Sequence, residues 1–313
     1  MNIGTIGLLS TLAIVGIAYI ASWWKLERAR GDTLAANPQE SGSGRSRRMH
    51  FADLIVGFVT NFFDTLGIGS FAPTTAYFKL RGRMPDEQIP GTLNAGQALP
   101  TMIQALIFIS IVSVDLWTMV SMIGAAVLGA WFGVGWVSKL SRRSIQLGMG
   151  LALLCAAVLF LASNLHWMPG GGEALKLTGP LLVVAIVINA FLGALMMLGV
   201  GLYAPCLILV SLLGMSPLAA FPIMSGSCGL LMPVGGVRFV RSGRYNLGAA
   251  LGLALGGIPG VLVAAYIVKS LPIAWLRWLV LAVVLYAAIA MLRSARQTGA
   301  APVPPSGAES SGR

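Results

Sequence analysis

Two pairs of glycines interrupt apolar segments of this chain, and the backbone around them is where we expect chemistry. Gly67 and Gly69 break one segment, Gly199 and Gly201 break another, and Ser70 directly follows the first pair. A helix that restarts after such a break presents free N–H groups and the positive end of its dipole, which favour an anion. Glycine lets a ligand approach the backbone closely. The two breaks therefore predict two half-helix ends that bind one anion between them.

Uncharged polar side chains near the breaks could complete this site. They lie just after each break and at the start of the apolar segment that follows it. Hydroxyl and amide groups can hydrogen-bond the oxygens of an anion. The same groups could equally hold helices together, and the glycines could equally serve close helix packing. The residues expected to bind the substrate are Gly67, Gly69, Ser70, Thr74, Thr75, Asn94, Gln97, Gly199, Gly201, Tyr203, Ser225 and Ser227.

Asp64 is the one acid that the sequence places well inside an apolar segment. Burying its charge without a partner would cost several kcal/mol. As a functional group it would take up and release a proton, and as a structural group it would cap backbone N–H groups near Gly67. A third interpretation has Asp64 and the carbonyl groups of the break bind Na⁺. The sequence leaves these roles open.

The composition requires a membrane. Of 313 residues, 57% are hydrophobic and 10% are charged, whereas soluble domains are about 25% charged. A span needs about 20 apolar residues, so the chain can cross on the order of eight times. Cys155, Cys206 and Cys228 lie in apolar stretches without metal-like spacing, so no cofactor and no metal site are expected. The basic clusters lie between apolar segments, which indicates topology and not nucleic-acid binding.

The chain contains an internal repeat. Residues around the first break match residues around the second at one constant offset. Chance does not readily explain so many matches at a single offset. The matches therefore predict that the chain consists of two similar halves. The matching pairs are Leu66 with Leu198, Gly67 with Gly199, Gly69 with Gly201, Ala72 with Ala204, Pro73 with Pro205, Gly82 with Gly214, Pro85 with Pro217, and Pro90 with Pro222.

The positive charges orient the two halves. If the broken segments, residues 51–78 and 180–213, each crossed once, the Lys and Arg residues would divide weakly between the two sides. If each enters and returns as a re-entrant hairpin, all but three of the 21 Lys and Arg residues face the cytoplasm, the exceptions being Lys176, Lys269 and Arg277. The positive-inside rule favours the hairpins. Each half then holds a hairpin and three spans, so the second half is upside down relative to the first.

These observations predict an all-α integral membrane protein with an inverted-topology repeat and one extra N-terminal transmembrane helix. We expect that helix in residues 1–22, with its N-terminus outside, and a flexible cytoplasmic linker in residues 23–50. The first half occupies residues 51–178 and the second half residues 179–296. The last segment, residues 297–313, is expected to be a disordered, cytoplasmic C-terminal tail.

The segments GIGSFAP from Gly67 and GVGLYAP from Gly199, each followed by a helix with a polar start, resemble the sulfite exporter TauE/SafE family of bacterial membrane transporters. The resemblance covers about residues 51–292. It implies a multi-pass protein of the inner membrane that moves sulfite, an organosulfonate or a related organic anion. The family's glycine cluster usually reads GxGGG, whereas Phe71 and Tyr203 stand in the corresponding region here, and these bulky side chains would narrow or reshape the pocket.

The predicted function is therefore secondary transport of a small anion, and most simply export, by alternating access around a midplane site between the two hairpin tips. An ion channel, or a cation-coupled carrier that uses Asp64, is the alternative. An enzyme is not expected, because the apolar segments contain no histidine and a single well-buried acid, too few groups for a hydrolase. The expected partners are the anion and the lipid bilayer, without nucleic acid, and a homodimer is left open.

Overall fold

The described part of the chain is helical almost throughout. The computed structural model describes residues 3–36, 48–132, 172–197, 201–270 and 273–299, together with scattered positions between 147 and 165. The third span expected in the first half, residues 145–165, therefore falls largely outside the described residues. The helices are α1 (Ile3–Ala36), α2 (Phe51–Thr65), α3 (Phe71–Leu80), the short 3₁₀ helix η2 (Asp86–Gln88), α4 (Ile89–Ile111), α5 (Leu116–Phe132), α8 (Gly179–Met197), α9 (Tyr203–Leu212), α10 (Pro217–Ser242), α11 (Leu247–Ser270) and α12 (Ile273–Gly299).

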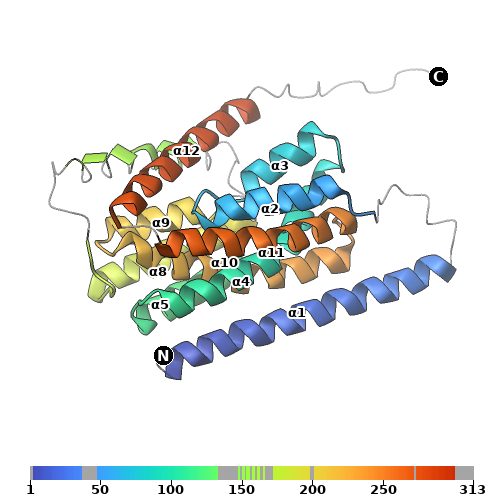
Figure 1. The fold of residues 1–313 in the computed structure, drawn as a ribbon, viewed down its shortest axis with the longest axis horizontal. Helices are drawn as coiled ribbons and strands as arrows, with labels where there is room; N and C mark the ends of the chain where they lie inside the picture. The colour runs from blue at the N-terminus through green and yellow to red at the C-terminus, as the bar shows by residue number, and fades with distance from the viewer. Residues whose placement is uncertain are drawn as a thin grey trace, which may run out of the picture.

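Several of these helices have the length and composition of membrane spans. Within the described residues, α1, α4, α8, α10 and α11 each contain a stretch that is long and apolar enough to cross a bilayer. Shorter apolar helices lie in α5, α9 and α12. Because so many apolar helices pack side by side in one bundle (Figure 1), the chain is a multi-pass membrane protein.

The first broken segment returns to the end of the bundle from which it starts. Asp53 lies in the first turn of α2, and Arg83 follows α3. The Arg83 guanidinium donates to Asp53 Oδ2 at 2.6 Å and lies 3.2 Å from His50 Nε2. Figure 1 shows α2 running from the right-hand end of the bundle toward its middle and α3 leading back. We name α2 and α3, residues 51–80, hairpin 1.

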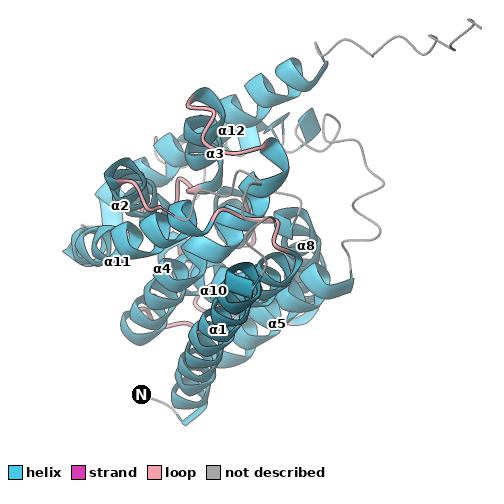
Figure 2. Ribbon diagram, turned by 90° about the vertical axis from the view of Figure 1, so that its right-hand side faces the viewer, coloured by secondary structure: helices cyan, strands magenta, loops and turns pink. Residues whose placement is uncertain are grey.

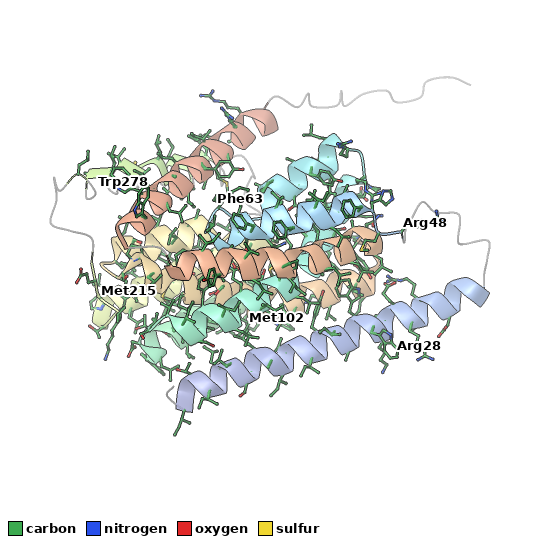
Figure 3. The ribbon with its side chains drawn as sticks, in the orientation of Figure 1. Arg28, Arg48, Phe63, Met102, Met215 and Trp278 are labelled. Carbon is green, nitrogen blue, oxygen red and sulfur yellow. The ribbon has the colours of Figure 1, made fainter. Side chains whose placement is uncertain are left out.

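The second broken segment also returns to its starting end, which is the opposite one. Ala174 precedes α8, and Met215 and Ser216 follow α9. The Ser216 N–H donates to the Ala174 carbonyl oxygen at 2.9 Å, and Ala174 and Met215 form an isolated β-bridge. Figure 3 places Met215 at the far end of the bundle from Arg48. We name α8 and α9, residues 179–212, hairpin 2.

Each hairpin packs against a helix that is distant from it in the sequence. Helices α4 and α10 pair at the centre, α2 packs on α11, and α8 packs on α5. The α2–α11 contact runs along glycines of α11, where a Cβ at Gly256 would overlap the Leu54 carbonyl and one at Gly260 that of Phe58. Small residues let membrane helices approach this closely.

One end of the bundle collects several of the basic residues that the structure describes. Arg48 and Arg83 lie at the base of hairpin 1, the Arg30 guanidinium donates to the Val240 carbonyl oxygen at 2.7 Å, and Gly91 lies against the Arg244 carbonyl. These contacts bring together the ends of α1, α3, α10 and the starts of α2, α4 and α11. The opposite end, beside the start of α5 and the base of hairpin 2, carries Lys176, because the Asp115 N–H just before α5 donates to the carbonyl oxygen of the neighbouring Leu175 at 2.8 Å.

Helix α1 differs in length from the expectation, because it continues past Ser22 to Ala36. The first part of the expected linker is thus helical, and residues 37–47 lie outside the described residues. Helix α1 lies along the outside of α4 and α10 (Figure 2). Its extension has good helix formers and a Glu27–Arg30 ion pair at 2.8 Å one turn apart. At the other end of the chain, α12 runs to Gly299, slightly beyond the expected start of the tail, and residues 300–313 lie outside the described residues.

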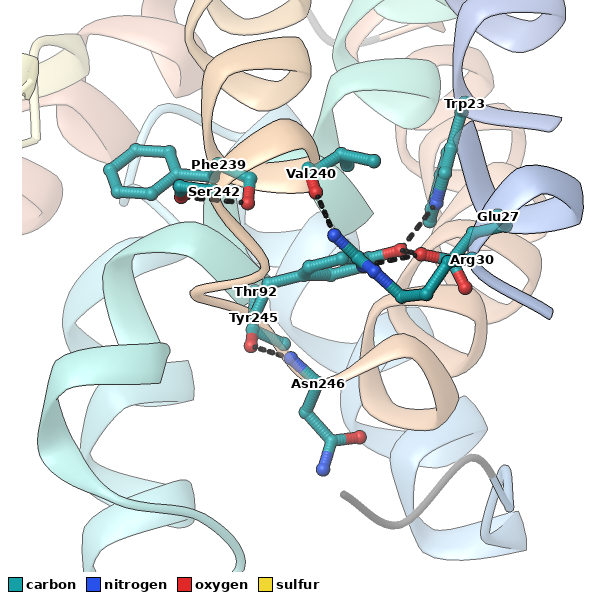
Figure 4. A network of polar contacts seen from close by, with 9 residues as sticks. All are labelled: Trp23, Glu27, Arg30, Thr92, Phe239, Val240, Ser242, Tyr245 and Asn246. Atoms are coloured by element: carbon teal, nitrogen blue, oxygen red, sulfur yellow. Dashed lines mark hydrogen bonds and ion pairs between the residues drawn. The ribbon is translucent and has the colours of Figure 1, made fainter. Parts of the chain in front are cut away.

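Tyr245, between α10 and α11, fastens the extension of α1 to the bundle (Figure 4). Its hydroxyl donates to Glu27 Oε1 and accepts the Trp23 indole N–H at 3.0 Å. Burial and the bond to Glu27 raise the pKa of Tyr245 well above its usual range, so the hydroxyl keeps its proton as a donor. The basic end of α1 is therefore held by side-chain bonds and not only by apolar contact.

Tyr245→Phe is expected to lower the thermal stability of the detergent-solubilised protein. The substitution removes two hydrogen bonds and leaves the buried Trp23 N–H without its acceptor, which costs about 1–3 kcal/mol. Tyr266→Phe is the matched control, because the Tyr266 side chain is 77% exposed. Thermal unfolding followed by tryptophan fluorescence measures both. Equal melting temperatures for the two variants would show that the Tyr245 bonds contribute nothing.

Candidate functional site

The first break is a pair of left-handed turns. Helix α2 ends at Thr65 and α3 begins at Phe71. Gly67 has φ +97° and Gly69 has φ +86°, a region that side chains other than glycine rarely adopt. Together they reverse the chain direction, and they leave the N-terminus of α3 pointing into the bundle, with Pro73 in its first turn.

The second break is described only in part. Helix α8 ends at Met197, and Gly199 lies outside the described residues together with Leu198 and Val200. The chain is described again from Gly201, and α9 begins at Tyr203 with Pro205 in its first turn. The Cys206 N–H donates to the Leu202 carbonyl oxygen at 3.0 Å. The N-terminus of α9 thus also lies inside the bundle.

A single cavity joins the two breaks. Its enclosed space is small and has room for about one water molecule. Anything larger than water therefore requires the surrounding helices to move. The lining residues are Asp64, Gly69, Ser70 and Phe71 from hairpin 1, Met196, Gly201, Leu202 and Tyr203 from hairpin 2, Thr101 from α4, and Met232 from α10.

Asp64 caps the half-helix that follows it. The carboxylate is buried, with 2% of the residue exposed, and its Oδ1 accepts the Ser70 N–H at 2.6 Å. The Tyr203 hydroxyl of hairpin 2 lies close to the same carboxyl group. The Asp64 carboxylate thus accepts the Ser70 N–H at the start of α3. An anionic ligand at this helix end would compete for the same donor.

Gln97 of α4 holds the first turn of α3 from the side. The Ser70 hydroxyl donates to Gln97 Oε1 at 2.6 Å, and Gln97 Nε2 donates to Thr74 Oγ1 at 3.2 Å. The Thr74 hydroxyl in turn donates to the Ser70 carbonyl oxygen at 2.7 Å. All three side chains are buried. Gln97 and Thr74 therefore position the backbone of the cavity and do not line it themselves.

Gln97→Leu is expected to raise the KM for any anion that binds at this cavity. The apolar side chain has a similar size but leaves the buried Ser70 hydroxyl without its acceptor and Thr74 Oγ1 without the Gln97 donor, at a cost of about 1–3 kcal/mol. Each 1.4 kcal/mol at the binding step changes affinity about tenfold. Ser110→Ala removes a polar group from the exposed face of the same helix and should leave KM unchanged. A Gln97→Leu variant with wild-type KM would contradict the positioning role.

Tyr203 connects hairpin 2 to α4. Its hydroxyl donates to Gln104 Oε1 at 3.1 Å. Gln104 is fully buried, and its Nε2 has no hydrogen-bond partner among the described residues. An unmade buried donor is costly, so this amide is a second source of N–H groups close to the cavity.

Other expected site residues lie elsewhere. The Asn94 amide donates to the Pro90 carbonyl oxygen at 2.9 Å, and its Oδ1 faces Gly235 of α10. The Ser225 hydroxyl bonds within its own helix, and Ser227 accepts from Asn189 of α8 at 3.3 Å. The following expected residues are not among those that line the cavity: Gly67, Thr74, Thr75, Asn94, Gln97, Ser225 and Ser227.

The lining also contains residues outside the set expected to bind the substrate. Thr101 lies one helical turn after Gln97, so the spacing along α4 could have identified it. Met196 stands at the repeat position of Asp64, so the repeat register could have identified it too. Met232 carries no such signal, because a methionine inside an apolar helix looks like any core residue.

The described residues contain no group of three His, Cys, Asp or Glu side chains that could hold a metal ion.

Comparison with known proteins gives a match at the level of family. The family model described as Sulfite exporter TauE/SafE matches residues 4–160, half of the chain. This segment contains hairpin 1, α4 and α5, and hence Asp64, Ser70 and Thr101 of the cavity. No curated protein and no solved structure matches the chain.

Proposed function

The chain belongs to the sulfite exporter TauE/SafE family, and on that premise we propose that it is a secondary transporter of a small anion that binds between the tips of hairpins 1 and 2. Sulfite, an organosulfonate or a related organic anion is the expected cargo, and export is the expected direction. The observation that carries this proposal is the cavity to which both hairpins contribute the residues just before and after their breaks.

The cavity supports an inverted repeat, because its lining residues correspond in pairs. Gly69 of hairpin 1 and Gly201 of hairpin 2 occupy the same repeat position. The pairs continue on both sides of the glycines and cover most of the lining. They are Asp64 with Met196, Gly69 with Gly201, Ser70 with Leu202, and Phe71 with Tyr203.

Helix packing supports the same repeat. In the repeat, α2 corresponds to α8, α4 to α10 and α5 to α11. The α2–α11 contact therefore corresponds to the α8–α5 contact, and the central α4–α10 pair is its own counterpart. The bases of the two hairpins lie at opposite ends of the bundle, as inverted halves require. In secondary transporters such halves rock against each other around a shared site.

The distribution of charge supports one orientation in the bilayer. We assign the basic end, with Arg48 and Arg83, to the cytoplasm and the end with Lys176 to the outside. The N-terminus of α1 then lies outside, and α12 ends on the cytoplasmic side. The bacterial inner membrane is the location that the family implies.

Purified protein in liposomes tests the proposed function. Uptake is measured for sulfite, sulfoacetate, taurine-derived sulfonates and carboxylates, with and without a pH gradient, against protein-free liposomes. We expect saturable uptake of at least one anion and acceleration by unlabelled anion on the opposite side. Saturation with counterflow distinguishes a carrier from a channel. Absence of uptake for the whole panel would refute the assignment.

Single cysteines test the orientation independently of the substrate. In a background with the exposed Cys155 replaced by serine, Arg81→Cys and Ser216→Cys are treated from outside intact cells with an impermeant thiol reagent. Labelling at position 216 but not at position 81 is required. The reverse pattern, or labelling of both, would overturn the proposed topology.

A further inference from the structure

A groove lies between α5 and α10, next to the end of α8 in hairpin 2, and it faces the basic end of the bundle. Ser227, Leu231, Val234 and Arg238 form one stripe along α10 at helical spacing. Ser227 contacts Asn189 of α8, but α8 ends at Met197, so the stripe continues beyond its partner. Val234 and Arg238 are accordingly exposed. A hairpin that turns back inside the bundle leaves this face of α10 uncovered by α8.

The groove is apolar apart from one guanidinium, and its enclosed space, like that of the central cavity, has room for about one water molecule. It is lined by Val127, Ala130 and Trp131 of α5, Met197 of α8, and Leu231, Val234, Gly235 and Arg238 of α10. Met197 and Leu231 are the chain neighbours of Met196 and Met232, which line the central cavity. The groove and the cavity therefore lie on either side of the same two stretches of chain.

Arg238 lies at the basic end of this groove. Its Cζ is 4.3 Å from the centre of the Trp131 ring. Within the described part of the chain, the structure gives the guanidinium no carboxylate partner. Stacking uses the flat face of a guanidinium and leaves its N–H edges free, and those edges match the paired oxygens of a sulfonate or carboxylate.

We propose that this groove is a second anion subsite, in which Arg238, held by Trp131, captures the oxyanion group of an organic sulfonate or carboxylate, while the apolar part of that anion enters between the walls when α5 and α10 move apart. The inference rests on the proposed function and deepens it. The subsite is the cytoplasmic antechamber of the central cavity, and its apolar walls favour organic anions over sulfite.

The charge of the groove is tested without any transport measurement. Val234→Cys is made in the background that lacks Cys155 and is treated, in inside-out vesicles, with an anionic and a cationic methanethiosulfonate. The anionic reagent should react faster, relative to its rate with a free thiol. Arg238→Gln should lower the anionic-to-cationic ratio several-fold. Arg241→Gln, which removes an equal charge one turn away in the last turn of α10, should not.

Two outcomes of the labelling would overturn the subsite. If position 234 reacts with neither reagent, lipid fills the groove and Arg238 binds lipid headgroups. If Arg238→Gln and Arg241→Gln change the ratio equally, the groove senses only the net charge of the membrane face. Either result leaves the central site and the proposed function untouched.

Transport kinetics provide a second test of the proposed subsite. With an organosulfonate that the wild type carries, Arg238→Gln should raise KM several-fold with little change in kcat, and Arg238→Lys should restore part of the loss. Arg241→Gln should match the wild type. A KM that does not respond to Arg238→Gln refutes the subsite, whereas failure of the wild type to carry any anion refutes the proposed function itself.

Discussion

Asp64→Asn is expected to make anion transport independent of pH. The Asp64 carboxylate accepts the Ser70 N–H, the donor that we propose for a bound anion. Protonation removes the negative charge and weakens that bond, so the wild-type KM should fall as the pH falls. Hydrogen bonds to charged groups contribute about 1.5–3 kcal/mol, which corresponds to a change in KM of about tenfold or more. The variant carries a neutral amide at every pH and should keep the low-pH KM throughout.

Asp115→Asn is the matched control for this experiment. Asp115 precedes α5 at the end opposite to the basic one, and the Thr118 N–H that donates to it lowers its pKa. Its replacement should leave the pH dependence of uptake intact. Initial rates in liposomes at a series of pH values measure all three proteins. Unchanged pH dependence in Asp64→Asn would remove Asp64 from the mechanism and leave it as a helix cap.

Gly129→Leu is expected to abolish assembly of hairpin 2 with α5. A Cβ at Gly129 would overlap the Ala190 carbonyl of α8, and one at Gly193 would overlap the Ala126 carbonyl of α5. Overpacking a core typically costs about 1–3 kcal/mol, and here the obstacle is backbone, which no rotamer change relieves. Separation of the two helices would also displace Gly201 and Tyr203 from the cavity. Size-exclusion chromatography of a fluorescent fusion should show loss of the monodisperse peak.

Gly124→Leu is the corresponding control on the same helix. An added Cβ at Gly124 meets no atom within 4 Å, so this variant should elute like the wild type and transport like it. The comparison separates a steric effect at one contact from a general intolerance of α5 to leucine. Similar chromatograms for the two variants would show that the close approach at Gly129 is not required.

The helix breaks and the general course of the chain follow from sequence, because glycine pairs and basic loops act locally. The position at which α1 ends could not be predicted in this way. The segment from Lys25 onward is rich in charged residues, and a charged segment next to a membrane span is usually interpreted as a loop. It stays helical because Tyr245 and the Val240 carbonyl bind Glu27 and Arg30, contacts that join residues far apart in the chain.

Half of the cavity could be predicted and half could not, for a related reason. Asp64, Gly69, Ser70, Gly201 and Tyr203 stand out because polar or turn-forming residues are rare in apolar segments. Which face of α4 and α10 meets the hairpins depends on packing between the halves. For that reason residue type alone could not show that Thr101 and Met232 line the cavity whereas Asn94 and Ser227 do not.

The packing of each hairpin on the opposite half makes the two halves mutually dependent for folding. A fragment that stops before residue 179 would present α5 without α8 and α2 without α11, leaving glycine-lined surfaces bare in the lipid. We therefore expect that neither fragment folds on its own and that the first stays incompletely packed in the bilayer until the second is inserted. Co-expressed fragments should then complement each other where either one alone is degraded.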